Sequence, residues 1–189
     1  LQWVCEQAEP GQLDPVDTCA GACLEGEQEV VGWMMDRELV DRTDPEVVGQ
    51  LFSSACHGTL EMAQWVHQQC PTLDHHWRGD QAFANACETS LALAQWVYSL
   101  GGVDHLAGDG QPFDNACRAG LEVAQWVHSL GGMDHSHIRR VWEKALLTSN
   151  WEIASWIQTL GLDRQEVIRQ CTRQRVYSSL ERVRHLTTT

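Results

Sequence analysis

Residues 121–127 read LEVAQWV, and nearly the same text returns as LEMAQWV at residues 60–66, LALAQWV at 91–97 and WEIASWI at 151–157. The tryptophan of this motif belongs to a longer series, because six of the nine tryptophans in the chain lie 30 to 32 residues apart. These six are Trp3, Trp33, Trp65, Trp96, Trp126 and Trp156. A fixed period of this length is typical of stacked structural repeats. The 189 residues therefore predict a solenoid of five or six short units.

Each unit of the repeat predicts two helices. In the unit around residue 115, Pro112 stands in the first turn of a helix, where proline is tolerated, and Phe113 and Cys117 fall on one face. Gly120 ends this helix, and a second helix follows from Leu121. The second helix is apolar except for a narrow polar stripe. So wide an apolar surface has to be covered both by the first helix and by the neighbouring units.

The text of the unit resembles a known family. Residues 112–123 read PFDNACRAGLEV, which resembles the ankyrin signature, whose helix 1 reads Pro-Leu-His-x-Ala-Ala and whose helix 2 opens Gly-x-Leu-Glu-Val. The recurring Ala-Cys and Ala-Gln-Trp-Val text resembles in particular the ankyrin arrays of large DNA viruses of protists. The chain departs from the family at Asp114, where the family usually has histidine, and the middle units lack one residue before the leucine. The resemblance implies an all-α ankyrin-repeat solenoid of helix-loop-helix units with short hairpin-like loops.

The register of the repeat divides the chain into units. Five are predicted, at residues 17–43, 44–79, 80–108, 109–137 and 138–163. Residues 1–16 are predicted to be the end of a preceding repeat and the loop that leads into the first unit, because Trp3 copies Trp126. Residues 164–189 carry six arginines. They are predicted to be a capping repeat, since a terminal unit must present a polar outer face to water.

The composition excludes several classes of partner. The net charge is −13, and residues 1–163 hold twenty-four Asp/Glu against seven Lys/Arg. The negative charge of residues 1–163 repels phosphate groups. We therefore expect neither nucleic acid to bind on the repeat face nor the chain to bind a membrane. The sequence contains no run of eighteen apolar residues, which a transmembrane helix would need, and residues 1–6 do not resemble a secretory signal. We expect an intracellular protein, cytoplasmic or nuclear, whose partner is another protein with a basic or neutral surface.

The repeat register also separates structural residues from candidate contacts. Cysteines that follow alanine at one repeated position are expected to be reduced and buried, because free cysteine packs as a small hydrophobe. The predicted structural core contains Trp33, Trp65, Trp96, Trp126 and Trp156 together with Cys56, Cys87 and Cys117. Trp77 lies outside this register, in the loop at residues 74–80 beside Arg78. Its composition fits an interface hot spot, and equally a residue that packs against the adjacent loop.

Histidines gather beside aspartates in the loops at residues 74–76, 104–105 and 134–137. Stacked helices lie about 8 to 10 Å apart, whereas zinc ligands lie about 2 Å from the ion, so equivalent loops do not converge on one metal. We therefore predict no metal and no cofactor, and expect each aspartate to accept backbone N–H groups in its turn. Histidine side chains at the loops can still make binding sensitive to pH. The sequence contains no catalytic motif, which argues against an enzyme and against a small-molecule substrate.

The predicted function is therefore a non-catalytic scaffold for protein–protein interaction. The resemblance implies that the partner binds on the concave side, along helix 1 and the loops. The residues predicted to contact it are His76, Trp77, Arg78, Asn85, Glu88, Leu106, Asp114, Asn115, Arg118 and Arg139. Two alternatives remain open at this point. One is a metal- or pH-sensing regulatory module built on the loop histidines, and the other is a targeting arm or adaptor of a larger enzyme or ubiquitin-ligase assembly.

Overall fold

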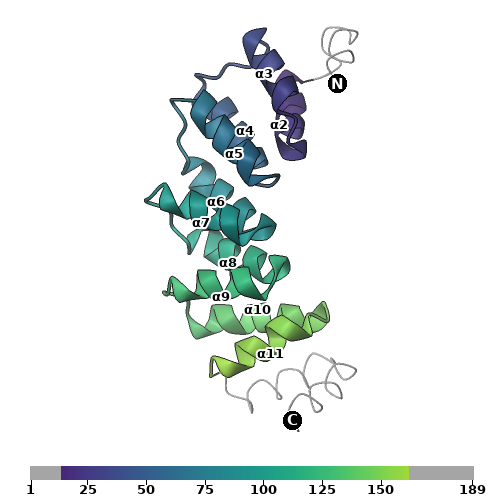
Figure 1. Cartoon of the computed structure of the whole chain (residues 1–189). Helices are drawn as coiled ribbons and strands as arrows, with labels where there is room; N and C mark the ends of the chain where they lie inside the picture. Colours follow the sequence, from purple (N-terminus) through teal and green to yellow (C-terminus); the bar gives the residue numbers. More distant parts are fainter. Residues whose placement is uncertain (1–13, 162–189) are drawn as a thin grey trace.

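The computed structural model describes residues 14–161, and this part of the chain is all α-helical, with no strand (Figure 1). The helices are α2 (Pro15–Glu25), α3 (Gln28–Asp36), α4 (Pro45–Ala55), α5 (Leu60–Gln69), α6 (Trp77–Thr89), α7 (Leu91–Ser99), α8 (Ala107–Ala119), α9 (Leu121–Ser129), α10 (His135–Leu147) and α11 (Trp151–Thr159). The predicted all-α class is confirmed for these residues. The predicted cap at 164–189 and nearly all of the predicted segment 1–16 lie outside the described residues.

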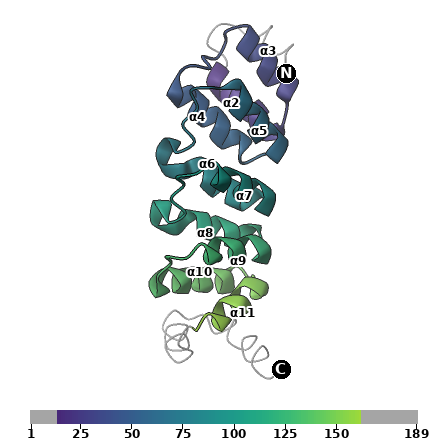
Figure 2. The same cartoon turned by 60° about the vertical axis from the view of Figure 1, so that its left-hand side comes forward.

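The helices pack in consecutive pairs, α2 with α3 through α10 with α11. The first helices of the pairs also contact one another in order, α2 to α4, α6, α8 and α10, and form what we call the first-helix row. On the other side, α7, α9 and α11 contact one another in the same way. Figures 1 and 2 show the pairs one above another along a single long axis. Among the described residues, no helix is both long and apolar enough to span a bilayer.

The helix starts follow local sequence signals. Asp14 precedes Pro15, and its carboxylate accepts a hydrogen bond from the backbone N–H of Val16, so α2 begins inside the stretch predicted as a loop. Thr59 and Ser90 cap α5 and α7 in the same way through their hydroxyl oxygens. Such an N-cap typically contributes about 1 kcal/mol. These caps fix where each helix begins and therefore which of its faces meets the core.

An unusual turn interrupts the first residues of α6 and of α8. Arg78, Gly79 and Asp80 have φ of 52°, 67° and 62°, so three consecutive residues are left-handed, and residues 108–110 repeat this turn with φ of 60°, 56° and 77°. Regular helix starts only after these residues. Asp109 and Gly110 both belong to this left-handed turn. A left-handed residue with a Cβ costs about 1–2 kcal/mol, so contacts from elsewhere must stabilise Arg78 and Asp80.

The tryptophan ladder, as we call the recurring tryptophans of the described residues, lies at the edge of the core and not in its centre. It consists of Trp33, Trp65, Trp96, Trp126 and Trp156. In α7 the fully buried residues are Leu93, Ala94 and Val97, whereas Trp96 is only half-buried. The same holds for Trp33, Trp65, Trp126 and Trp156. At 100° per residue, Trp96 points roughly 110° away from the middle of the buried face. The tryptophans predicted as structural core thus pack against the core from its edge, a position that the repeat text does not reveal because it does not show where the apolar face is centred. The predicted cysteines Cys56, Cys87 and Cys117 are buried as expected.

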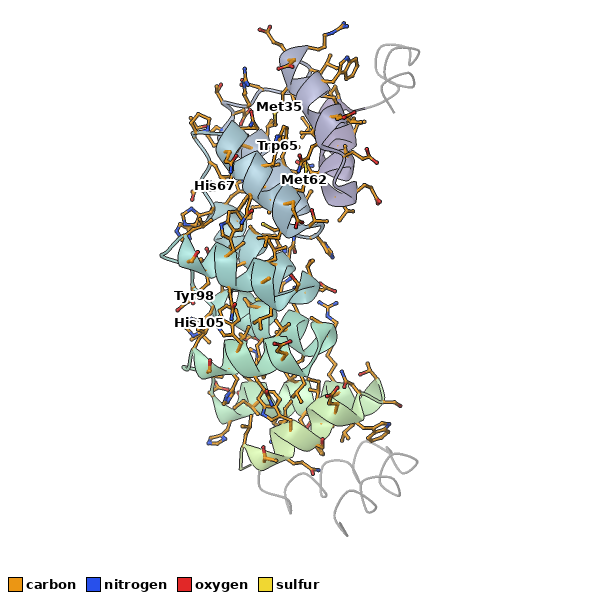
Figure 3. The ribbon with its side chains drawn as sticks, in the orientation of Figure 1. Met35, Met62, Trp65, His67, Tyr98 and His105 are labelled. Atoms are coloured by element: carbon orange, nitrogen blue, oxygen red, sulfur yellow. The ribbon has the colours of Figure 1, made fainter. Side chains whose placement is uncertain are left out.

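Three tryptophans of the ladder, Trp96, Trp126 and Trp156, each bridge two successive helix pairs. The Trp96 ring meets Phe52 and His67 of the preceding pair, with centroids 6.1 and 5.7 Å apart and nearly edge-on geometry. Trp126 repeats this contact with Phe83 and Tyr98 one level on. His67 and Tyr98 lie on the same side of the stack at successive levels (Figure 3). Since an edge-to-face aromatic pair contributes about 0.5–1.5 kcal/mol beyond its buried area, the ladder stabilises the stacking of one pair on the next.

Candidate protein-binding surface

The start of α6, where the sequence left an interface hot spot and a packing residue equally open for Trp77, packs back onto the preceding helix pair. Trp77 Nε1 donates to Glu46 Oε2 at 2.8 Å, and Arg78 Nη2 lies 2.7 Å from Glu46 Oε1. The Arg78 guanidinium stacks over the Trp77 ring, 4.4 Å from its centroid. The hydrogen bonds from Trp77 and then from Arg78 lower the pKa of the Glu46 carboxyl. Trp77 and Arg78 thus connect α6 to α4, and the interpretation of Trp77 as a packing residue is the one the structure supports.

A glycine makes this contact possible. The Trp77 ring lies directly over Gly49 of α4, and a Cβ added there would lie 2.3 Å from Trp77 Cγ. Gly110 stands at the same position of its unit, seven residues before the repeated cysteine, and the His137 ring covers it equally closely. The glycine that recurs at residues 49 and 110 was the sequence signal that an aromatic ring from the next unit packs on this position. It was missed because Asp80 fills this position in the unit between them.

The loop histidines link successive loops. His75 Nε2 bonds the carbonyl of Gly101 at 2.9 Å, and His105 Nε2 bonds that of Gly131 at 2.8 Å. His76 Nδ1 lies 2.6 Å from Asp80 Oδ1, which helps to hold Asp80 in its left-handed conformation. His105 lies at the loop edge of the stack (Figure 3). His76 is therefore engaged within the protein, although it was predicted to contact a partner.

The loop aspartates accept backbone N–H groups, as predicted. Asp74 accepts from His76 at 2.9 Å, Asp104 from Leu106 at 2.9 Å and Asp134 from His137 at 2.8 Å. Within residues 14–161 no group of three or more His, Cys, Asp or Glu side chains is placed to hold a metal ion.

Two asparagines predicted as partner contacts are occupied inside the stack. Asn115 is 2% exposed, and its Nδ2 donates to the carbonyl of Ala84 at 2.7 Å. Asn85 Nδ2 donates to both the carbonyl and the hydroxyl of Ser53, at 2.9 and 3.0 Å. Sequence reasoning missed these contacts, because the register of one unit shows which face meets helix 2 but not how closely the neighbouring first helix approaches. The asparagines satisfy polar groups along the first-helix row.

Two further predicted contacts also have partners within the chain. Leu106 is half-buried, and its Cδ1 lies 2.9 Å from the point that a Cβ on Gly132 would occupy, so the leucine packs under the next loop. Arg139 Nε lies 3.7 Å from Glu143 Oε1, one turn along α10. Leu106 is therefore a packing residue, and Arg139 lies on α10 with an ion-pair partner of its own.

Polar side chains from α8 and α10 surround an open cleft of about 320 Å³ on the first-helix row. We call it the α8–α10 cleft, and it is lined by Gly108, Asp109, Gln111, Asp114, Asn115, Arg118, Arg140 and Lys144. It thus brings together the predicted contacts Asp114 and Arg118, and the predicted contact Glu88 of α6 lies 3.3 Å from Arg118. Arg140 and Lys144 were missed, because the text of α10 diverges from the repeat and gave no register for its exposed face.

The charges of the cleft form a network across the two helices. Arg140 Nη1 donates to Asp109 Oδ2, which raises the pKa of Arg140 further above its usual value. Lys144 Nζ lies 3.6 Å from Asp114 Oδ2. The other oxygen of Asp114 is buried without a hydrogen-bond partner and lies 3.7 Å from His137 Nε2. The cleft can therefore bind a polar or charged group, with cations at its rim and a buried carboxylate at its side.

The three cysteines of the repeated position, Cys56, Cys87 and Cys117, lie in environments that do not activate their thiols. Burial raises the pKa of the Cys56 and Cys87 thiols well above the usual range, and that of Cys117 to about 12. Because the thiolate is the nucleophile, these three groups remain protonated and unreactive near neutral pH. Their observed role is to fill space between the helices of each pair.

Neither a family model, a curated protein nor a solved structure matches this chain. The resemblance to ankyrin repeats therefore rests on residues 112–123 and their copies along the chain. The observed stack and its cleft have to carry the functional argument by themselves.

Proposed function

We propose that this chain is a non-catalytic scaffold built of ankyrin-type repeats, and that a protein partner binds on the first-helix row around α8 and α10. The observation that carries the proposal is the α8–α10 cleft, where exposed charged side chains from two helix pairs surround about 320 Å³ of open space. The loop edge is less suited to this role, because His76, Trp77 and Leu106 are engaged in contacts between pairs.

The cleft is also the natural place for an anchoring contact. In an interface, the strongest contacts are generally side chains that enter a pocket and are shielded from water, while flat surroundings contribute little. The α8–α10 cleft meets this description, and the acidic surface around it attracts a partner with a basic or neutral surface.

The proposal is tested with one bulky substitution on each side of the stack. Gln111→Trp places an indole at the cleft, whereas Gln95→Trp makes the same change on the exposed face of α7. Neither substitution changes the charge, and both positions are exposed, so circular dichroism should show both variants folded. We expect the intact chain and Gln95→Trp to capture the same protein from a lysate, and Gln111→Trp to lose it.

Two results would count against the proposal. One is equal capture by all three proteins, which would place the contact elsewhere. The other is loss of capture by Gln95→Trp alone, which would place it on the second helices.

A further inference from the structure

We propose that the α8–α10 cleft binds a carboxylate, and that the partner inserts an acidic side chain, Asp or Glu, between α8 and α10. This inference rests on the proposed function, since it names the chemistry of one contact on that surface. It comes from the distribution of charge, from the count of accessible donors and acceptors, and from the size of the cleft.

The cleft gathers cations in a chain that has few. Residues 14–161 contain seven Lys/Arg and twenty-one Asp/Glu, yet three of those seven cations, Arg118, Arg140 and Lys144, line this one cleft. Only two acidic residues, Asp109 and Asp114, line it with them. Glu88, which pairs with Arg118 from α6, lies outside the lining. The lining thus carries one net positive charge, which Glu88 balances, whereas residues 14–161 with seven cations and twenty-one carboxylates carry a net charge of −14. The cleft therefore repels an anionic group far less than the rest of the described surface does.

Hydrogen-bonding capacity points the same way. Arg118 and Lys144 have side chains 51% and 50% exposed, and each retains N–H groups that its partners Glu88, Asn115 and Asp114 do not use. The acceptors are less available, because Asp114 is only 21% exposed and its Oδ1 is buried, and the exposed carboxylate of Asp109 is already paired with Arg140. An incoming group therefore meets more free donors than free acceptors. A carboxylate can accept charge-assisted hydrogen bonds from the Arg118 guanidinium and from the Lys144 ammonium group at the same time.

The two acidic residues select the kind of anion. Asp109 and Asp114 hold Arg140 and Lys144 in place across the cleft, so the cations are already ordered before a ligand arrives. The same two carboxylates repel a second negative charge, which disfavours a phosphate dianion more than a carboxylate with a single charge. About 320 Å³ corresponds to roughly ten water molecules, at about 30 Å³ each, which suits one acidic side chain with some water.

Lys144 supplies a direct probe, because it is the only lysine in the sequence. Reductive methylation with ¹³C-formaldehyde labels its amine and that of the N-terminus and keeps the positive charge. The labelled chain is then titrated with N-acetyl-glutamic acid α-amide, with the neutral N-acetyl-glutamine amide and with N-acetyl-phosphoserine amide. We expect a saturable shift of the Lys144 signal with the glutamic acid compound, none with the glutamine compound, and weaker binding of the phosphoserine compound.

A matched pair of variants separates the site from the overall charge. Arg118→Gln and Arg42→Gln each remove one exposed arginine, but Arg42 lies in the loop before α4, far along the sequence from the cleft. Arg118→Gln should weaken binding of the glutamic acid compound about tenfold, since a hydrogen bond to a charged group contributes about 1.5 kcal/mol or more. Arg42→Gln should leave the titration unchanged.

The inference is overturned by no saturable shift of Lys144, by equal shifts with the glutamine compound, by tighter binding of the phosphoserine compound, or by equal weakening in both variants. The titration uses no partner protein, so its failure can be told from failure of the scaffold proposal. Capture that depends on Gln111 but occurs without carboxylate binding would refute only the chemistry of the contact. Carboxylate binding without any captured protein would refute the scaffold.

Discussion

Replacing Gly49 by alanine should destabilise the chain, although the same change usually stabilises a helix. A Cβ at residue 49 would lie 2.3 to 2.6 Å from three atoms of the Trp77 indole, so the ring has to move. Removing glycine from a helix interior gains about 1 kcal/mol. Overpacking costs about 1–3 kcal/mol, and the displaced ring also loses its hydrogen bond to Glu46, about 1 kcal/mol. We expect a net loss of about 1–3 kcal/mol in the free energy of unfolding.

The matched control is Gly21→Ala in α2, where an added Cβ would meet no atom within 4 Å. This variant should be more stable than the intact chain by up to about 1 kcal/mol. Urea denaturation followed by circular dichroism measures both changes. Adding Trp77→Ala to Gly49→Ala should recover part of the loss attributable to the clash. Equal stabilisation by both alanine substitutions would refute the argument that Trp77 packs on Gly49.

Three further predictions follow from single residues. Asn115→Ala should lower the free energy of unfolding by about 1–3 kcal/mol in urea denaturation, because it leaves the carbonyl of Ala84 without its donor. Hydrogen bonds from His137 N and then Ser136 lower the pKa of Asp134, so its stabilisation is complete above about pH 4 and is lost as the pH falls through the folded pKa; Asp134→Asn should reduce the loss of stability measured below pH 4. The Cys56 thiol should resist iodoacetamide at neutral pH in the folded chain and react after urea is added, as measured by mass spectrometry of its peptide.

The sequence predicted the elements of this fold better than their contacts. The tryptophan period and the Gly and Pro positions predicted paired helices, and the described residues are helical in pairs. The left-handed turn at residues 78–80 could not be predicted, because it requires three consecutive residues at positive φ and one of them, Arg78, is of a type that rarely adopts it. Asp80 keeps that conformation through bonds to His76 and to the backbone N–H of Asp104, which lies in the next loop. Such long-range bonds leave no local pattern in the sequence.

The candidate site shows the same limit. Asp114 and Arg118 were predicted as contacts and do line the cleft, because both lie on the face of α8 that points away from α9. Asn115 lies on the same helix but donates to Ala84 of α6. The sequence of a single unit does not show which residues of the neighbouring unit lie against it. The cleft depends on α10, whose sequence HSHIRRVWEKALL lacks the Ala-Cys of the other first helices. Its residues Arg140 and Lys144 could be placed only with three-dimensional coordinates.

The most direct test of the central claim is hydrogen–deuterium exchange on the chain alone and on the chain bound to its captured partner. Binding of the partner should protect backbone amides of the first-helix row. We therefore expect slower exchange in peptides that cover the start of α8 and in peptides from α10. Peptides from α7 and α9, the second helices, should exchange at the same rate in both states. Slower exchange confined to the second helices, or no change at α8 and α10, would contradict a scaffold that binds its partner at the α8–α10 cleft.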